Sequence, residues 1–257
     1  MRIDVAFTPA EAGPAHVAVV VDVMRATSTI AQALASGYQR VLCCAEIDDA
    51  RALREQLGDE AAVGGERDAV LIEGFDLGAS PRDYLEPRAE TAILTTTNGT
   101  RTILAAAANA EVVLLGSLLN LDAVAAAARR PGDDITVVCS GYGGAFAIDD
   151  AYCAGRFITL LQGERTDAAV ASAAIARAYP TTWEGVNART YGPPGLEDDL
   201  RWCTQENTLT VVPRFTRMIG PAAEIKRAKG FRPSTDIYSS QQGRGSFPHG
   251  GSPSYPS

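Results

Sequence analysis

The feature that most constrains the fold is the alternation of short apolar runs with helical segments over the first 160 residues. Residues 17–23 form a β-branched run typical of a strand buried on both faces, and a helical pattern follows at 30–36. The unit recurs, with further strands predicted at 40–44, 91–95, 111–115 and 135–139 and helices at 46–57, 101–108, 120–130 and 149–161. Such alternation calls for parallel strands joined by helical crossovers. We therefore predict a three-layer α/β/α fold with a mainly parallel sheet.

The C-terminal part follows a different pattern. Beyond residue 161 the pattern is mostly helical, with helices predicted at 167–179, 196–203 and 221–229, and we expect these to cover one side of the sheet or its mouth. With 257 residues in all, residues 1–232 are predicted to form a single α/β domain. Residues 233–257 are rich in Gly, Pro and Ser and are predicted to be a disordered tail.

Composition excludes several classes of function. The formal net charge of -8 argues against nucleic acid or an anionic membrane as the main partner. Only two histidines are present, so a His-based triad or a His-ligated zinc site is close to excluded. The five cysteines show no Cys-x-x-Cys spacing, which fits a reducing compartment. No signal peptide or membrane span is visible, and we expect a cytoplasmic protein.

Polar residues collect just after the predicted strands, where ligands bind in α/β sheets. Asp22 and Arg25 follow the first strand, with hydroxyls at 27–29 on the next helix's first turn, an arrangement that suits Mg²⁺ with phosphate. The alternative is an ordinary helix cap with a salt-bridged aspartate. The same choice holds for the glycine-containing stretches 64–67 and 74–81, which are either ligand loops or ordinary turns.

Two later clusters carry more polar groups. Residues 95–101 read Thr-Thr-Thr-Asn-Gly-Thr-Arg and place hydroxyls, an amide and a guanidinium at one helix start, a dense set of donors for an oxyanion. Residues 140–144 are predicted to form a glycine-rich turn, and Asp149 and Asp150 follow at a helix start. These acids either interact favourably with the helix dipole or complete a metal site. Cys139 ends a predicted strand and is expected to be a buried apolar residue, not a nucleophile. Neither a Walker loop nor a dinucleotide fingerprint is present.

The same clusters resemble the 2-phosphosulfolactate phosphatase family of coenzyme M biosynthesis. The matching stretches, in the family's order, are VDVMRATSTI at 21–30, GGER at 64–67, GFDLGASP at 74–81, TTNGTR at 96–101, GSLLN at 116–120, and CSG at 139–141 with Asp150. The resemblance implies an α/β phosphatase that uses Mg²⁺ to hydrolyse 2-phospho-3-sulfolactate to 3-sulfolactate and phosphate. Two departures concern the substrate: Ala79 stands where the family pattern has Asn, and Asp149 where it has Glu.

From these residues we expect a site for a small anionic phosphoester. The carboxylates expected to hold Mg²⁺ are Asp22, Asp76, Glu66 and Asp150. The catalytic residues are expected to be Asp22, Arg25, Glu66, Arg67, Asp76, Asn98 and Arg101. The substrate-binding residues are expected to be Thr27, Ser80, Thr97, Gly99, Thr100, Asn120, Ser140 and Gly141.

Two alternatives remain open at the level of the sequence. The same donors suit a non-catalytic module that binds a phosphorylated or sulfonated metabolite, although such a module needs no metal carboxylates. A phosphatase of the same chemistry can also act on another phosphorylated 2-hydroxy acid. Whether the protein is a homo-oligomer stays open too, because the Ala-rich helices at 101–108 and 121–130 can pack within a subunit or between subunits.

Overall fold

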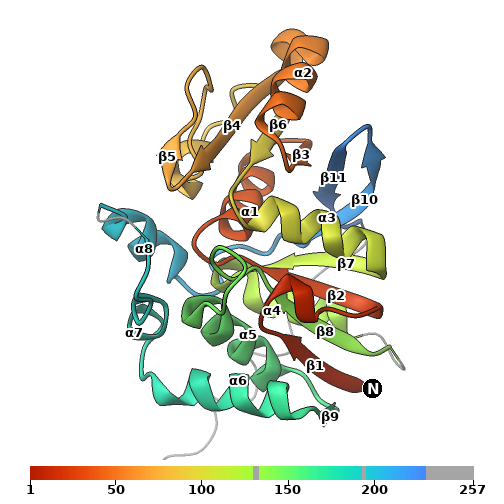
Figure 1. Cartoon of the computed structure of the whole chain (residues 1–257), viewed down its shortest axis with the longest axis vertical. Helices are drawn as coiled ribbons and strands as arrows, with labels where there is room; N and C mark the ends of the chain where they lie inside the picture. Colours follow the sequence, from red (N-terminus) through yellow and green to blue (C-terminus); the bar gives the residue numbers. More distant parts are fainter. Residues whose placement is uncertain (130–132, 193–194, 230–257) are drawn as a thin grey trace, which may run out of the picture.

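The structure is a computed structural model that describes residues 1–129, 133–192 and 195–229. It has a mixed α/β fold with one large sheet, as predicted (Figure 1). Its strands are β1 (Arg2–Ala6), β2 (Ala15–Val21), β3 (Arg40–Cys44), β4 (Ala61–Arg67), β5 (Val70–Leu71), β6 (Thr91–Thr95), β7 (Ala110–Gly116), β8 (Ile135–Cys139), β9 (Glu164–Arg165), β10 (Pro213–Ile219) and β11 (Ala222–Arg227). Its helices are α1 (Ala26–Ser36), α2 (Ile47–Leu57), α3 (Gly99–Asn109), α4 (Leu121–Ala128), α5 (Ile148–Leu160), α6 (Asp167–Ala178), α7 (Thr182–Asn187) and α8 (Glu197–Cys203).

The sheet consists of two parallel blocks joined by a hairpin. One block is β4-β6-β3, and the other is β7-β2-β8-β1-β9. The hairpin β10–β11 lies between the blocks and pairs antiparallel with both β3 and β7. Parallel pairing is therefore present within each block, but it does not run through the whole sheet. In Figure 1 strands β4 and β6 run steeply across the picture while β2 and β7 lie nearly horizontal, which agrees with the twist expected of a large sheet.

The hairpin corrects the prediction of a helix at 221–229. Residues Ala222–Arg227 form strand β11 because they pair with β3 on one side and β10 on the other. Ala223 and Ile225 are fully buried in the process. Without the hairpin, the edges of β3 and β7 would present unpaired backbone N–H and C=O groups. The hydrogen bonds gained by pairing these edges outweigh the helix propensity of residues 222–227.

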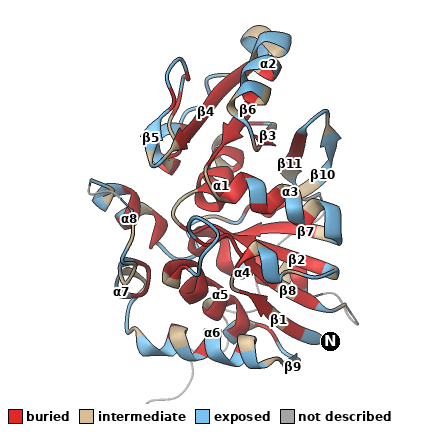
Figure 2. Cartoon of the chain, in the orientation of Figure 1, coloured by how far each residue is buried: buried red, intermediate tan, exposed pale blue. Residues whose placement is uncertain are grey.

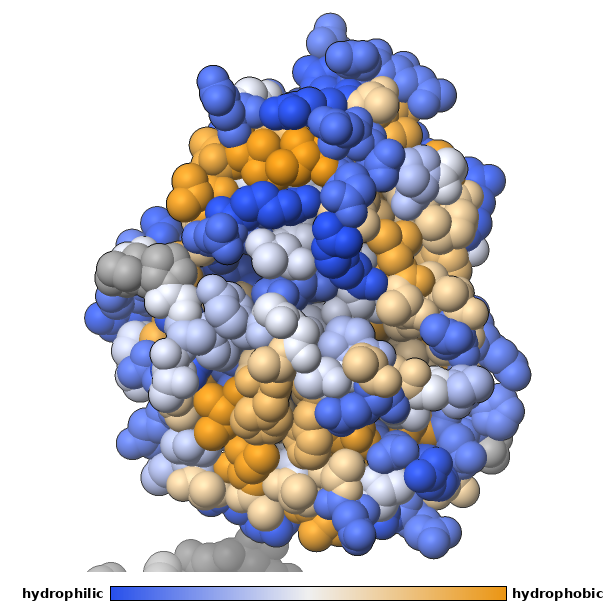
Figure 3. All heavy atoms as spheres, viewed as in Figure 1, coloured by the Kyte–Doolittle hydropathy of each residue, from blue (hydrophilic) through white to orange (hydrophobic). Residues whose placement is uncertain are grey.

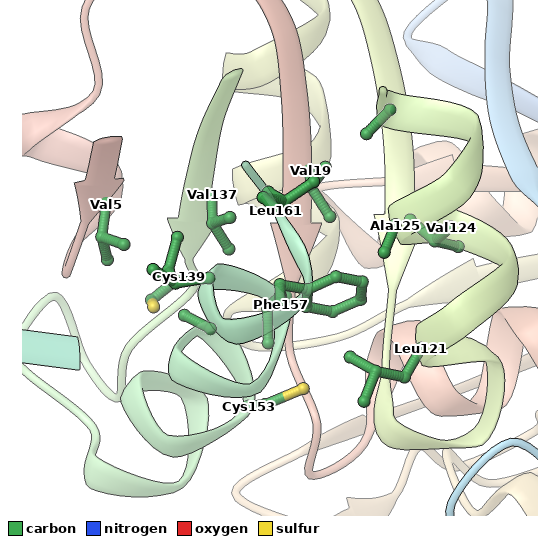
Figure 4. Close-up of a cluster of buried hydrophobic side chains, with 14 of the residues drawn as sticks. Val5, Val19, Leu121, Val124, Ala125, Val137, Cys139, Cys153, Phe157 and Leu161 are labelled. Carbon is green, nitrogen blue, oxygen red and sulfur yellow. The ribbon is translucent and has the colours of Figure 1, made fainter. Parts of the chain in front are cut away.

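The core is divided between the two faces of the second block. Along β2, Val19 and its alternate neighbours pack with α4, α5 and α6, whereas Ala18 and Val20 pack with α1 and α3. Figure 4 shows the first of these clusters, with Phe157 of α5 among side chains from β2, β8 and α4. Figure 2 shows the central strands, such as β2, β4 and β6, buried along most of their length and α2 and α6 exposed on their outer sides. β2 is therefore buried on both faces, as its β-branched run predicts.

The glycine pair Gly64–Gly65 lies within β4 and not in a ligand loop. A Cβ on Gly64 would lie 2.0 Å from the Tyr84 hydroxyl, and a Cβ on Gly65 would lie 2.2 Å from the Thr95 carbonyl oxygen. Gly65 also has a φ of 156°. These glycines therefore allow close packing of β4 against its neighbours, and the stretch 64–67 is the end of a strand and neither a loop nor a turn.

The carboxyl ends of β2, β6 and β8 meet in the middle of the molecule, where α1, α3 and α5 begin (Figure 1). Asp150 in the first turn of α5 accepts a hydrogen bond from the Val23 N–H just after β2, at 2.9 Å. Gly99 at the start of α3 lies against Asp22, since a Cβ there would be 2.4 Å from Asp22 Oδ2. Loops from both blocks of the sheet are thereby brought to one place.

Other predictions concern parts remote from this junction. All five cysteines are buried and free, as expected for Cys139 in particular. None of the helices in the described ranges is both long enough and apolar enough to cross a membrane. The predicted tail, residues 233–257, lies outside the described residues.

Candidate active site

A polar cavity opens where the strand ends meet. The empty space within it, open solvent at the mouth included, is about 540 Å³. Figure 3 shows hydrophilic residues gathered over the middle of this face of the molecule. The lining residues come from the end of β4, from the loops after β2, β4, β5, β6 and β8, from the first residue of α1 and from the segment between α7 and α8: Asp22, Met24, Arg25, Ala26, Glu66, Asp68, Ala69, Ala79, Thr96, Thr97, Asn98, Tyr142, Arg189, Tyr191, Gly192 and Leu196.

Asp22 is the buried acid of the cavity. Its Oδ1 accepts the Ala26 N–H at 3.1 Å, and Oδ2 has no hydrogen-bond partner within the described part of the chain. Burial raises the pKa of Asp22 to about 7; the Ala26 N–H opposes this rise, and the Asp149 and Glu66 carboxylates add to it. Two helices, α1 and α3, begin beside it, so their positive dipole ends face the same space.

Glu66 organises the loop between β6 and α3. Its Oε1 accepts the Thr97 N–H at 2.7 Å, and its Oε2 accepts the Ala69 N–H at 2.7 Å and the Thr97 hydroxyl at 3.2 Å. Asn98 Oδ1 accepts the Gly143 N–H at 3.1 Å and so connects this loop to the turn after β8. Both carboxylate oxygens of Glu66 are thus committed to holding the loop that lines the cavity.

The two acids at the start of α5 have different partners. Asp150 accepts the N–H groups of Val23 at 2.9 Å and Gly141 at 3.0 Å, so its two oxygens tie together the loops after β2 and β8. Asp149 accepts the Tyr191 hydroxyl and the Asp150 N–H on Oδ1, but its Oδ2 is buried and has no partner. Burial raises the pKa of both carboxyls, and for Asp150 the Asp149 and Asp22 charges raise it further.

Two of these buried carboxylates have an oxygen that could bind a divalent cation. Asp22, Asp149 and Asp150 are each at most 7% exposed, and one oxygen of Asp22 and one of Asp149 lack a protein donor. Within the described ranges, no three His, Cys, Asp or Glu side chains form a complete metal cage. Mg²⁺ does not need one, because it is usually held by one or two carboxylates and completes its octahedron with waters and substrate phosphate.

Arg25 reaches the cavity from the start of α1 and is held by a distant segment. Its Nη1 lies 2.5 Å from Asp199 Oδ2 on α8, and both side chains are largely buried. The other oxygen of Asp199 accepts the Ser80 hydroxyl at 2.5 Å. Ser80 is therefore a partner of Asp199, and it does not itself line the cavity.

Of the residues predicted from sequence, Asp22, Arg25, Glu66, Thr97 and Asn98 line the cavity. Asp76 does not; its Oδ2 accepts the Val63 N–H at 2.9 Å and lies 3.7 Å from Arg54 Nε. The structure therefore separates Asp76 from the other predicted metal ligands. Its position after a glycine turn sends its side chain back onto β4 and α2.

The remaining predicted residues support the surroundings of the cavity. Arg67 donates to the carbonyls of Glu66 and Ala45, and Arg101 pairs with Glu46 at 2.8 Å on the surface. Five of the predicted substrate-binding residues are buried and make local hydrogen bonds or close backbone contacts: Thr27, Gly99, Thr100, Asn120 and Gly141. Ser140, whose Oγ is buried without a partner, lines a second hollow on the other side of Thr97 and Asn98.

Sequence reasoning missed the cavity residues that arrive from the C-terminal half. Arg189 and Tyr191 lie between α7 and α8, and Tyr191 stacks on Tyr142 with ring centroids 4.3 Å apart. From the sequence, Asp150 is assigned to the metal and Asp149 is given no separate role. A glycine-containing stretch with Arg and Tyr at 189–192 is the signal that could have pointed to a binding loop.

Comparison with known proteins places this cavity in a family. The model of the 2-phosphosulpholactate phosphatase family matches residues 6–218, which include every residue lining the cavity. The chain belongs to the 2-phosphosulfolactate phosphatase family. A relative from Pseudothermotoga lettingae, named as a probable 2-phosphosulfolactate phosphatase, is 36% identical over 83% of this chain and 95% of its own length. Relatives with the same name from Symbiobacterium thermophilum and Carboxydothermus hydrogenoformans are 37% and 36% identical over 81% and 83% of this chain.

The 2-phosphosulfolactate phosphatase relatives match this chain over most of both sequences, so the likeness extends beyond the first 160 residues that carry the motifs. The segment from α7 to α8, which supplies Arg189, Tyr191 and Asp199, falls inside the family match. The family resemblance noted from the motifs is thus confirmed.

Proposed function

We propose that the protein is a Mg²⁺-dependent phosphatase that hydrolyses 2-phospho-3-sulfolactate, or a closely related phosphorylated 2-hydroxy acid, to the free hydroxy acid and phosphate. The observation that carries the proposal is the meeting of two helix N-termini and Arg25 with the buried carboxylate Asp22 around one small cavity. The buried Asp149 lies behind the cavity wall, where it accepts the hydroxyl of the lining residue Tyr191. Helix starts and a guanidinium favour a phosphoryl group, and the acids favour a cation beside it. The membership of the family supports the same reaction.

Asp22 and Asp149 are the residues that would hold Mg²⁺. Each has an oxygen without a protein donor, whereas both oxygens of Glu66 and of Asp150 are occupied by backbone or side-chain donors. Bound there, Mg²⁺ would polarise the phosphoryl group and offset its negative charge. Asp150 and Glu66 then act by fixing the loops around the cavity.

The chain's own residues perform the binding and orientation. The starts of α1 and α3 and the Arg25 guanidinium face the phosphoryl group, and Asp199 fixes Arg25 in that position. In the net reaction a water oxygen bonds to phosphorus, the bond from phosphorus to the substrate's C2 oxygen breaks, and that oxygen gains a proton. Fixed donors placed where charge develops lower the barrier without reorganising during the reaction.

The test is phosphate release from 2-phosphosulfolactate by the wild type and by the Asp22→Asn and Asp149→Asn variants. Losing one group that stabilises the transition state typically costs about 3 kcal/mol, so each variant is expected to lose roughly a hundredfold in kcat. The control is Asp48→Asn on α2, whose side chain is 95% exposed and far from the cavity, and it is expected to retain the wild-type rate. Folded Asp22→Asn and Asp149→Asn proteins with the wild-type rate would contradict the proposal.

The alternative is a non-catalytic module that binds the same anions. A titration with Mg²⁺ separates the two, because the phosphatase requires the metal for turnover while the module binds its ligand without turnover. Isothermal calorimetry with 3-sulfolactate and a phosphate-release assay on 2-phosphosulfolactate should be run on one preparation. Binding without phosphate release at every Mg²⁺ concentration would favour the module.

Two finer descriptions belong with this proposal. The packing of α1 and α3 on one face of β2 and of α4, α5 and α6 on the other supports a three-layer α/β/α arrangement of the second block. Five free, buried cysteines are compatible with the cytoplasm as the compartment in which the protein works.

A further inference from the structure

One guanidinium in the cavity, that of Arg189, has no ion-pair partner among the described residues. The other arginines near the site are occupied: Arg25 by Asp199, Arg67 by backbone carbonyls and Arg101 by Glu46. Arg189 lines the cavity, yet within the described part of the chain it makes neither an ion pair nor a hydrogen bond, and its Nε is buried without a partner. Buried donors in native proteins are almost always satisfied by protein, water or ligand, so the Arg189 Nε is open to a partner beyond the described residues.

The nearby acids do not supply that partner. The positive charge of Arg189 lowers the pKa of the Asp149 carboxyl, but burial raises that pKa by more. No carboxylate in the described residues lies within ion-pair distance of Arg189, and Asp149 Oδ1 is already occupied by Tyr191 and the Asp150 N–H. The remaining Asp149 oxygen is the one that fits the cation. An anionic group of the ligand is therefore the counter-charge that the cavity leaves open.

The position of Arg189 identifies which group of the ligand it meets. The phosphoryl group is accounted for by the helix starts and Arg25, which belong to the loops after β2 and β6. Arg189 comes from the segment between α7 and α8, beside the stacked rings of Tyr142 and Tyr191. A ligand that binds both the helix starts with Arg25 and the guanidinium of Arg189 needs a second anionic group in addition to its phosphate.

We propose that Arg189 binds the acid group that the substrate carries beside its phosphate, and that it thereby selects phosphorylated acids over neutral phosphomonoesters. The inference rests on the proposed function and adds a residue that determines specificity. A guanidinium suits this task because its planar fork matches a carboxylate or a sulfonate with two parallel hydrogen bonds.

The kinetic test compares Arg189→Met and Arg189→Lys with the wild type on three substrates: 2-phosphosulfolactate, 2-phospholactate and glycerol 2-phosphate, which has no acid group. Losing a charge-assisted hydrogen bond should lower kcat/KM for the acids about 10- to 100-fold, mainly through KM, while the rate on glycerol 2-phosphate changes less than about threefold. Arg189→Lys should restore part of the loss. Arg177→Met, an exposed charge change on α6, is the control and should leave all three rates unaltered.

The two acid substrates identify the bound group. An equal loss on both points to the carboxylate, and a loss confined to 2-phosphosulfolactate points to the sulfonate; both support the inference. An unchanged ratio of acid to neutral rates in folded Arg189→Met and Arg189→Lys proteins would overturn it.

Binding measured without turnover separates this inference from the proposed function. By calorimetry, Arg189→Met should weaken 3-sulfolactate binding about 10- to 100-fold and leave inorganic phosphate binding within about threefold. If the wild type releases no phosphate from any acid but its 3-sulfolactate binding still depends on Arg189, the phosphatase proposal fails and the role of Arg189 stands. If neither anion binds the wild type, both fail.

Discussion

At the residue scale, the chemistry of the cavity depends on the few polar atoms that the protein leaves without partners. Asp150 and Glu66 have the same functional group as Asp22 and Asp149, yet their oxygens are filled by backbone N–H groups. Hydrogen bonds of this kind fix a loop and leave the carboxylate fewer lone pairs for a ligand. Atoms without a partner among the described residues, such as Asp149 Oδ2 and Arg189 Nε, are therefore the ones available to bind a ligand.

Gly99 gives a prediction at this scale, because it lets α3 begin directly against Asp22. A Cβ there would lie 2.4 Å from both Asp22 Oδ2 and Ala26 Cβ, and Ala26 is fixed in a helix. We expect Gly99→Ala to lower the free energy of unfolding by about 1–3 kcal/mol and to displace the Asp22 carboxylate, with at least a tenfold loss of kcat. Denaturant unfolding and a phosphate-release assay measure the two effects.

Gly13→Ala is the matched control, since a Cβ on Gly13 meets nothing within 4 Å. It should change neither the stability nor the rate. A Gly99→Ala protein that is as stable and as active as the wild type would show that α3 can move away from Asp22 at little cost.

At the scale of elements, α8 completes a site that the sheet and the first helices begin. It carries Asp199, which binds Arg25 at the start of α1 and Ser80 before the short 3-10 helix Pro81–Tyr84. Three segments far apart in the sequence are thus tied at one carboxylate that is 6% exposed. A helix in the C-terminal part therefore fixes a cavity residue supplied by the N-terminal part.

Asp199→Asn tests this role. Removing one partner of a buried ion pair leaves the other charge unpaired, so we expect a loss of about 3 kcal/mol in stability and a rise in KM of about tenfold as Arg25 loses its fixed position. Asp199 is a positioning residue, so kcat should fall less than kcat/KM. Thermal unfolding and steady-state kinetics separate the two effects.

The control for this prediction is the neighbouring residue on the same helix. Asp198 pairs with Arg82 at 3.2 Å on the surface and is 70% exposed, so Asp198→Asn should change stability by less than about 0.5 kcal/mol. An equal effect of the two substitutions would indicate that α8 responds to its net charge and not to the Arg25 contact.

At the scale of the whole molecule, the hairpin β10–β11 connects two blocks of the sheet. Its Glu224 is 1% exposed and accepts hydrogen bonds or ion pairs from Thr216 at 2.6 Å, Lys226 at 3.1 Å and Arg40 at 3.4 Å. Arg40 belongs to β3, so the carboxylate connects the hairpin to the first block. One acid therefore neutralises a group of cations at the joint between the blocks.

Glu224→Gln makes the stability of this joint measurable as a function of pH. Burial alone would raise the pKa of Glu224, but the hydrogen bonds from Thr216, Lys226 and Arg40 outweigh it and hold the pKa below the usual 4.5. A lowered pKa means that the contribution is complete above pH 4.5 and disappears as the pH falls through the folded-state value. We expect Glu224→Gln to lower the free energy of unfolding by about 2 kcal/mol near pH 7, and by less below pH 4.5. Urea unfolding at several pH values measures this difference.

Glu111→Gln is the control, because Glu111 is 76% exposed and lies 3.8 Å from His16 on the surface. Its effect should stay below about 0.5 kcal/mol at every pH. A Glu224→Gln difference that does not change with pH would mean that the ionised carboxylate is not what stabilises the joint.

The sequence by itself determined most of the helices and strands of the first 160 residues, although not β1, β4 or β5, and part of the site. Strand and helix periods are local, so β2, β6 and β8 follow from their apolar runs, and Asp22 and Asn98 follow because they come directly after strand ends. Tertiary structure alone decided the rest. The direction of the Asp76 side chain depends on the turn before it, and Arg189 and Asp199 reach the cavity and its surroundings through packing between distant segments. Residues 222–227 became a strand because two sheet edges needed pairing, a demand that no local pattern records.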